Sequence, residues 1–301
     1  MSFSLVPGFA QRYPKEDDSW LDDVLIESCC TSLDEALSAQ ARGADRIELC
    51  TDLSVGGLTP PRDLIREVIQ ALSIPVNVLI RPSTVIHCAG GFASRNHATL
   101  GRLATGALPQ TPPLRPAILQ GFPSRSPLAT DVAEGSSEAR RFGKQSQSAL
   151  TVEGFGFSAD DFVYDEEALQ QMIDDIEYCK TVGTAGIVVG ALTPEGAIDL
   201  PAMRRLIAAA QPLSVTFHRA FDVCTTDPYI ALDQLIALGC TRLLTSGQAP
   251  SAWEGRGVLA LLVRRAGGRI IVMPGSGVTP DNLQTLAAYT RAPEFHGTKL
   301  P

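Results

Sequence analysis

The sequence lacks several features that mark whole classes of protein. It has no run of about 20 apolar residues, so no segment is predicted to span a membrane. The start, Met1-Ser2-Phe3-Ser4-Leu5, lacks the basic region and apolar stretch of a secretion signal. There is no basic excess either, since the formal net charge is −8. We therefore expect no nucleic-acid partner and no anionic membrane partner, because phosphates would be repelled.

The cysteines do not form a disulfide framework. There are seven, an odd number, and no CxxC pair occurs among them. Together with the absence of a signal peptide, this usage indicates free thiols in a reducing compartment. We expect a cytoplasmic protein, with the nucleus as the alternative.

The stretch Leu213-Ser214-Val215-Thr216-Phe217-His218-Arg219-Ala220-Phe221-Asp222 is the clearest structural signal. Alternating apolar and polar residues predict a strand that ends in a charged loop, and a helical pattern and a second strand follow. The same unit recurs along the chain. Strands are predicted at 24–29, 46–50, 76–81, 186–190, 213–218, 242–245, 269–273 and 294–296, and helices at 32–41, 60–72, 165–182, 200–210, 227–238, 258–266 and 280–289. Strict alternation predicts an α/β fold, a TIM (β/α)8 barrel without its last helix.

The predicted domain organisation is one barrel over residues 23–301, preceded by a flexible arm over residues 1–22. Residues 83–160 interrupt the barrel after the third strand. They are rich in Gly, Pro and Ser and show no sustained period, so we expect a long insertion that is largely disordered.

Three segments place an acid two residues before a metal ligand: Glu27 and Cys29, Glu48 and Cys50, and Glu294 and His296. Side chains two apart share one face of a strand, and strands eight, one and two are neighbours in a closed barrel. We therefore expect the three pairs to converge in the barrel interior. The same alternation adds Asn77, Arg81, Thr216 and His218. Buried charges must be paired, solvated or used. For Arg46 we prefer a structural ion pair. For a second set we prefer a functional site at the mouth of the barrel: Glu27, Glu48, Arg81, His218, Glu294 and His296.

Two functions fit these residues. In the first, Cys29 and Cys50 bind Cu(I), with His296 or His218 as a third ligand, because thiolates select Cu(I) and zinc is the competitor. In the second, the protein is an enzyme that acts on a small anionic ligand by acid–base chemistry. The catalytic residues would then be Glu27, Glu48, Arg81, His218 and Glu294.

Two glycine-containing loops are candidate anion sites. Ser246 and Gly247 follow the sixth strand, and Gly275 and Gly277 follow the seventh. Such loops bind phosphate in many barrels. The structural alternative is a tight turn into a helix.

Several motifs together resemble the CutC copper homeostasis family. They include Gly43-Ala44-Asp45-Arg46-Ile47-Glu48-Leu49-Cys50, Ile80-Arg81-Pro82, Thr216-Phe217-His218-Arg219-Ala220-Phe221-Asp222 and Glu294-Phe295-His296. The resemblance covers residues 24–82 and 161–297. It implies a TIM barrel, a cytosolic protein that self-associates, and copper binding through Cys29 and Cys50.

The chain departs from the family pattern in its insertion and in stopping five residues after His296. Without a covering helix, apolar surface should be exposed between strands eight and one. This predicts marginal stability or a homo-oligomer that covers the gap.

Overall fold

The computed structural model describes residues 24–83 and 157–300. The predicted arm and nearly all of the predicted insertion lie outside the described residues. The described part resumes at Phe157, however, so the last four residues assigned to the insertion belong to the barrel. Ala159–Phe162 form a short 3-10 helix, η5, and Phe162 is buried.

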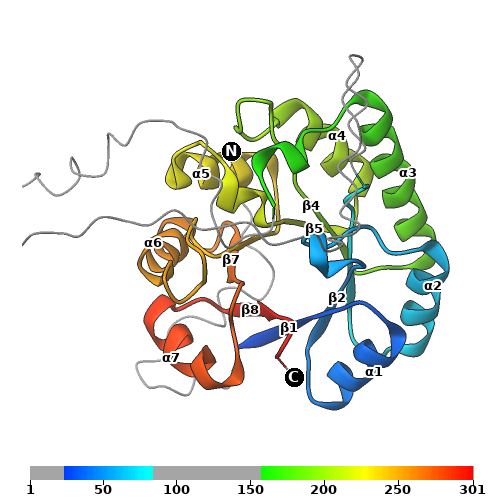
Figure 1. The fold of residues 1–301 in the computed structure, drawn as a ribbon, viewed down its shortest axis with the longest axis horizontal. Helices are drawn as coiled ribbons and strands as arrows, with labels where there is room; N and C mark the ends of the chain where they lie inside the picture. The colour runs from blue at the N-terminus through cyan, green and yellow to red at the C-terminus, as the bar shows by residue number, and fades with distance from the viewer. Residues whose placement is uncertain (1–23, 84–156, 301) are drawn as a thin grey trace, which may run out of the picture. The chain divides into compact units, whose positions relative to one another are not determined.

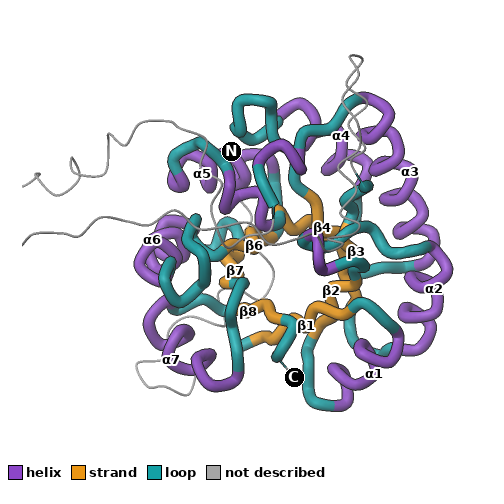
Figure 2. Tube along the Cα trace, viewed as in Figure 1, coloured by secondary structure: helices purple, strands orange, loops and turns teal. Residues whose placement is uncertain are grey.

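Eight parallel strands form a ring enclosed by helices, which confirms the predicted TIM barrel (Figure 1 and Figure 2). Ladders join neighbouring strands in the order β7-β6-β5-β4-β3-β2-β1-β8, and the ring closes where β7 and β8 meet. The strands are β1 (Leu25–Cys30), β2 (Arg46–Leu49), β3 (Val76–Leu79), β4 (Gly186–Val189), β5 (Ser214–Phe217), β6 (Arg242–Thr245), β7 (Ile271–Pro274) and β8 (Glu294–Gly297).

Seven α-helices alternate with these strands in the described residues, at the predicted places. They are α1 (Leu33–Ala41), α2 (Arg62–Ala71), α3 (Glu166–Val182), α4 (Leu200–Ala210), α5 (Pro228–Leu238), α6 (Arg256–Ala266) and α7 (Pro280–Thr290). Local chemistry sets their ends. Asp227 caps α5 through hydrogen bonds from the Tyr229 and Ile230 amides, and Gly239 ends it with a positive φ of 84°.

Side-chain alternation divides each strand between the helical shell and the barrel interior. Ile47 and Phe295 are fully buried and belong to the main hydrophobic core, which the helices also form. Their sequence neighbours point the other way. The register sets Glu27 of β1 opposite Arg46 of β2 and His296 of β8, one level below Cys29 opposite Glu48. On β1, β2 and β8 the barrel interior therefore carries polar side chains at successive levels.

The predicted exposed seam between β8 and β1 is absent at the residues that would form it. Ile26 is 8% exposed and Phe295 is 0% exposed, so their outward faces are covered. The Ser28 hydroxyl donates to the carbonyl oxygen of Leu300 at 3.3 Å, and Leu300 is itself buried. The last described residues thus lie over the outer side of β1, which removes the reason given above for expecting marginal stability or an oligomer.

Within residues 24–83 and 157–300, the structure contains no helix that is long and apolar enough to cross a membrane.

Candidate functional site

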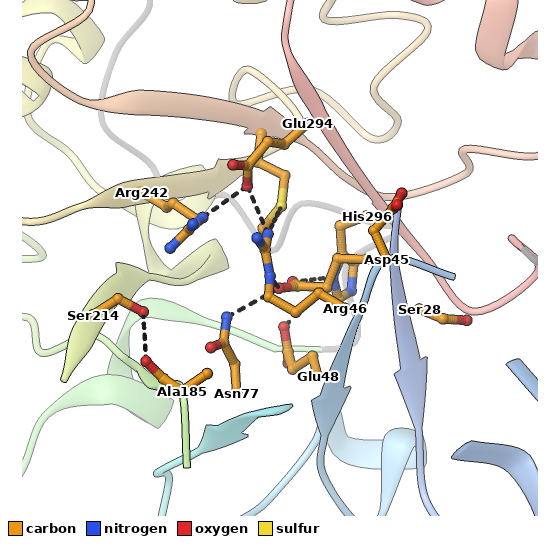
Figure 3. Close-up of polar contacts among 12 residues, drawn as sticks. Ser28, Asp45, Arg46, Glu48, Asn77, Ala185, Ser214, Arg242, Glu294 and His296 are labelled. Atoms are coloured by element: carbon orange, nitrogen blue, oxygen red, sulfur yellow. Dashed lines mark hydrogen bonds and ion pairs between the residues drawn. The ribbon is translucent and has the colours of Figure 1, made fainter. Parts of the chain in front are cut away.

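A layer of ion pairs fills the lower part of the barrel. Arg46 is buried, and its guanidinium contacts Glu27 Oε2 through Nε at 2.5 Å and Glu294 Oε2 through Nη2 at 2.6 Å. Arg242 Nε lies 2.7 Å from the same Glu294 oxygen (Figure 3). Asn77 donates its amide to Glu27 Oε2 at 3.1 Å. We call Glu27, Arg46, Arg242 and Glu294 the ion-pair layer. The ion pairs of Arg46 with Glu27 and Glu294 are the structural role that we expected for this arginine from the sequence.

The ion-pair layer holds two of the five residues predicted to be catalytic. Burial by itself would raise the pKa of Glu27, but Arg46 and His296 lower the pKa of this carboxyl well below its usual range. Neither Glu27 nor Glu294 lines the cavity described below. The expectation that Glu294 reaches the barrel mouth is therefore wrong, because it opens β8 at the level of Leu25, the first residue of β1.

Cys29 and Cys50 lie together above the ion-pair layer. Their Sγ atoms are 3.4 Å apart, and both side chains are buried and line one cavity. Leu79 and Val188 pack with them in a small apolar cluster that is separate from the main core. The hydrogen bond with Cys50, burial and the charge of Glu48 all raise the pKa of the Cys29 thiol well above its usual value. The two cysteines, which we call the sulfur pair, face the interior as strand alternation predicts.

Glu48 and His296 border the sulfur pair. His296 Nδ1 lies 3.0 Å from Glu27 Oε1 and 3.5 Å from Glu48 Oε2, and only the first distance makes a hydrogen bond. Burial raises the pKa of Glu48 to about 7, and its Oε2 has no hydrogen-bond partner among the described residues. Burial would lower the pKa of His296, but the Glu48 and Glu27 carboxylates raise it.

One set of potential metal ligands stands out among residues 24–83 and 157–300. A ligand atom from each of Cys29, Glu48 and His296 lies within 4.8 Å of the other two. The group contains Cys29 and His296 of the predicted metal set but not Cys50, and it adds Glu48, which was assigned from the sequence to catalysis only. The His218 imidazole, the other predicted third ligand, is not in this group.

The cavity above the sulfur pair has a volume of about 550 Å³ and opens at the carboxyl ends of the strands. Of the residues predicted to be catalytic, Glu48, Arg81 and His218 line it. The Arg81 guanidinium already makes contacts within the protein. Its Nη1 donates hydrogen bonds to the carbonyl oxygens of Val55 and Gly57 at 2.7 and 2.9 Å. The guanidinium also lies 4.8 Å from the centre of the Phe162 ring.

The loop after β6 does not offer its amides to an anion. The Ser246 and Gln248 N–H groups donate to the carboxylate of Asp222, and the Gly247 N–H donates to the Thr245 hydroxyl at 2.9 Å. The prediction of an anion site at Ser246 and Gly247 is therefore wrong, because the Asp222 and Thr245 side chains already accept the hydrogen bonds of these amides.

The two glycines predicted to bind an anion in the loop after β7 have different surroundings. The Gly275 N–H donates to the Thr245 carbonyl at 3.0 Å, so it is not available to an anion. Gly275 instead provides clearance, since a Cβ there would lie 2.5 Å from Leu244 Cδ1 and 3.5 Å from His296. Gly277 does line the cavity. Its part in anion binding stays a prediction.

Several lining residues were not found from the sequence. Phe157 and Phe162 form an aromatic wall with ring centres 5.4 Å apart, and Lys299 and Arg219 also line the cavity. Phe157 fell inside the predicted insertion, whose composition gave no sign of a contact with the barrel. Lys299 follows β8, where no element was predicted.

Comparison with known proteins gives consistent results. The model of the CutC family matches residues 24–93 and 157–300. A CutC family protein from Parabacteroides distasonis is 38% identical over 273 residues, which is 90% of this chain and 81% of that protein. One from Histophilus somni is 36% identical over 271 residues, covering 90% and 80% respectively.

A solved structure is also similar. It is a CutC protein from Streptococcus agalactiae with a proposed role in copper homeostasis, 27% identical to this chain, with a TM-score of 0.64. The match covers 92% of this chain and all of that one.

Proposed function

The chain belongs to the CutC family, and on that premise we propose that it is a copper homeostasis protein that binds Cu(I) through Cys29 and Cys50. The observation that carries the proposal is the 3.4 Å separation of the two Sγ atoms at the floor of the cavity. Two soft sulfur donors in contact suit Cu(I) better than they suit a hard cation.

The sulfur pair needs little movement to hold a metal. With metal–sulfur bonds of about 2.3 Å and a tetrahedral angle, two sulfurs stand about 3.8 Å apart. The observed distance is 3.4 Å, so the pair would open by a few tenths of an ångström. Leu79 and Val188 shield the sulfurs on one side, which favours a soft ion that tolerates an apolar surrounding.

His296 is the proposed third ligand. If Nδ1 donates its proton to Glu27, the other ring nitrogen remains available for a metal, and a histidine oriented by a carboxylate in this way is common in metal sites. Glu48 is the nearby carboxylate, and its charge offsets that of a bound cation. A carboxylate and a histidine beside two thiols also suit zinc, which makes zinc the competing ion.

Binding would release a proton, because the Cys29 thiol is protonated near neutral pH and a metal binds the thiolate. Protonated thiols protected from oxidation require a reducing compartment, so the proposed place of action is the cytosol. In that setting the protein would buffer or deliver copper.

A competition assay with a Cu(I) chelator under reducing conditions tests the proposal. The double variant Cys29→Ala/Cys50→Ala should lose Cu(I) affinity by more than about a hundredfold, which exceeds the loss typical of an outer-shell partner. The matched control is Cys179→Ala/Cys240→Ala, which removes two buried thiols away from the cavity and should retain the affinity of the unaltered protein. Equal Cu(I) affinity in both double variants would contradict the proposal, and tighter binding of Zn(II) than of Cu(I) would reassign the metal.

A further inference from the structure

The cavity is much larger than a metal ion requires. Its volume of about 550 Å³ compares with roughly 30 Å³ for one water molecule, and it falls within the range of about 300–1,000 Å³ that is usual for small-molecule sites. The sulfur pair lines part of it. His218, Arg81 and the aromatic wall of Phe157 and Phe162 line another part, which we call the His218 end.

His218 lines the cavity, and one of its ring nitrogens is a buried hydrogen-bond donor that the described residues leave unused. Its Nδ1 accepts the Ala220 N–H at 3.2 Å, so the proton of the neutral ring sits on Nε2. Burial and the charge of Arg81 lower the pKa of His218 to about 3, which keeps the ring neutral at physiological pH. The residue is 5% exposed, and Nε2 has no hydrogen-bond partner among the described residues.

The packing around His218 holds this donor in place. A Cβ on Gly190 would lie 2.5 Å from His218 Cε1, so only a glycine at the end of β4 leaves room for the ring. The Phe162 ring packs against the His218 ring, with ring centres 4.9 Å apart. Leaving a buried donor unpaired destabilises the folded protein, and a bound acceptor would remove that cost.

The charges that surround the cavity favour a negatively charged acceptor. Three basic residues line it, Arg81, Arg219 and Lys299, whereas Glu48 is the one carboxylate among its described lining residues. Arg219 is paired with Asp222 through Nε at 2.9 Å, and the balance remains positive after that pair is counted. Each guanidinium also lies near an aromatic ring, Arg81 over Phe162 at 4.8 Å and Arg219 over Phe157 at 5.2 Å.

We propose that the His218 end of the cavity binds a small organic anion, a carboxylate or a phosphate monoester with an apolar body. The anionic group accepts the His218 Nε2–H near Arg81, and the apolar body lies against Phe157 and Phe162. The site differs from the predicted glycine-loop cradles, because the amides after β6 are occupied by Asp222. It does not depend on copper binding, since it uses no residue of the sulfur pair.

Calorimetric titration of the full chain with benzoate and with phenyl phosphate tests this site, and benzyl alcohol serves as the neutral control. At least one anion should bind with an affinity in the millimolar range or better, while benzyl alcohol should not bind. The anion that binds more tightly identifies the preferred head group. Failure of both anions to bind would overturn the proposal, and so would equal binding of the neutral alcohol.

Variants locate the site. His218→Phe keeps a ring and removes the donor, so anion affinity should fall about tenfold or more, as expected for a lost hydrogen bond to a charge. Lys299→Met, at the exposed rim, should reduce affinity by a smaller factor. Arg205→Met removes a remote surface charge and should leave affinity unchanged. Equal affinity in His218→Phe and the unaltered protein would contradict the assignment.

A measurement on the unaltered protein makes the test independent of how well His218→Phe folds. In a nitrogen-15 spectrum of the histidine rings, the Nε2 signal of His218 should shift on addition of the bound anion. An unmoved His218 signal at saturating anion would refute the contact. Cys29→Ala/Cys50→Ala should bind the anion as the unaltered protein does, so that loss of copper binding and loss of anion binding are distinguishable. Anion binding abolished in that double variant would place the anion at the sulfur pair instead.

Discussion

Two layers of the same barrel interior differ in how their buried carboxylates are paired. In the ion-pair layer, each carboxylate is in contact with an arginine, and Arg46 joins Glu27 to Glu294. One level higher, in what we call the upper layer, Glu48 Oε2 has no hydrogen-bond partner among the described residues. His218 Nε2 has no hydrogen-bond partner among them either. On β1, β2 and β8 the residues of the two levels are two positions apart, as in Glu27 and Cys29, or Arg46 and Glu48.

The difference separates residues that hold the barrel together from residues that are available to a ligand. A carboxylate that is already paired with an arginine binds another cation poorly. Glu27 is such a group: Arg46 and His296 lower its pKa, and it does not line the cavity. A buried carboxylate such as Glu48, which lies 3.5 Å from His296 Nδ1 and forms no ion pair with an arginine among the described residues, keeps that affinity at the expense of stability. Glu27 links the layers, because it also accepts a hydrogen bond from His296 and so orients a residue of the upper layer.

The largest expected effect is the loss of the central arginine of the ion-pair layer. Arg46→Met should lower the free energy of unfolding by about 3–5 kcal/mol, because Glu27 is left buried without its arginine and Glu294 loses one of two. Urea titration measures this. The control is Arg205→Met, which breaks an exposed ion pair with Glu166 and should cause no measurable change.

A compensated variant sharpens the same comparison. Arg46→Met combined with Glu27→Gln removes the uncompensated charge of Glu27 and leaves Glu294 paired with Arg242, so it should recover much of the lost stability. If Arg46→Met alone were as stable as the unaltered protein, the lower layer would not have the structural role assigned to it.

A smaller effect is expected from the upper layer, and it depends on pH. The folded-state pKa of Glu48 is raised from 4.5 to about 7, so its contribution to stability is present at low pH and is lost as the pH rises towards 7. From about pH 5.5 to about pH 8 the unaltered protein should lose about 2 kcal/mol from this group. The raised pKa of His296 acts in the same direction.

Glu48→Gln removes the titrating group and should flatten this part of the pH dependence, measured by urea titration at both pH values. Glu167→Gln, on the exposed first turn of α3, is the matched control and should leave the dependence as it is. An unchanged slope in Glu48→Gln would show that the carboxylate is paired in solution and that the two layers do not differ in this respect.

The barrel could be predicted from the sequence because its signals are local. Alternation over five residues and caps such as Asp227 and Gly239 fix each strand and helix without knowledge of the others. Strand alternation also predicted that Cys29 and Cys50 face one interior, and their sulfur atoms do meet. Alternation depends only on the two-residue period of a strand, so it holds before any partner is known.

The height of each residue in the barrel could not be predicted in the same way. Glu27, Glu48 and Glu294 look alike in their Glu-x-Cys or Glu-x-His segments, but the register of β8 against β1 puts Glu294 opposite Leu25 and His296 opposite Glu27. Register depends on ladders between distant segments. The same limit explains the glycine loop after β6, whose amides are taken by Asp222 from the loop after β5.

X-ray absorption at the copper edge of the Cu(I)-loaded full chain tests the role of the upper layer most directly. The spectrum should show two sulfur neighbours at about 2.3 Å, and these should be absent in Cys29→Ala/Cys50→Ala. A spectrum with only nitrogen or oxygen neighbours, or sulfur neighbours that persist in the double variant, would contradict the proposed copper site.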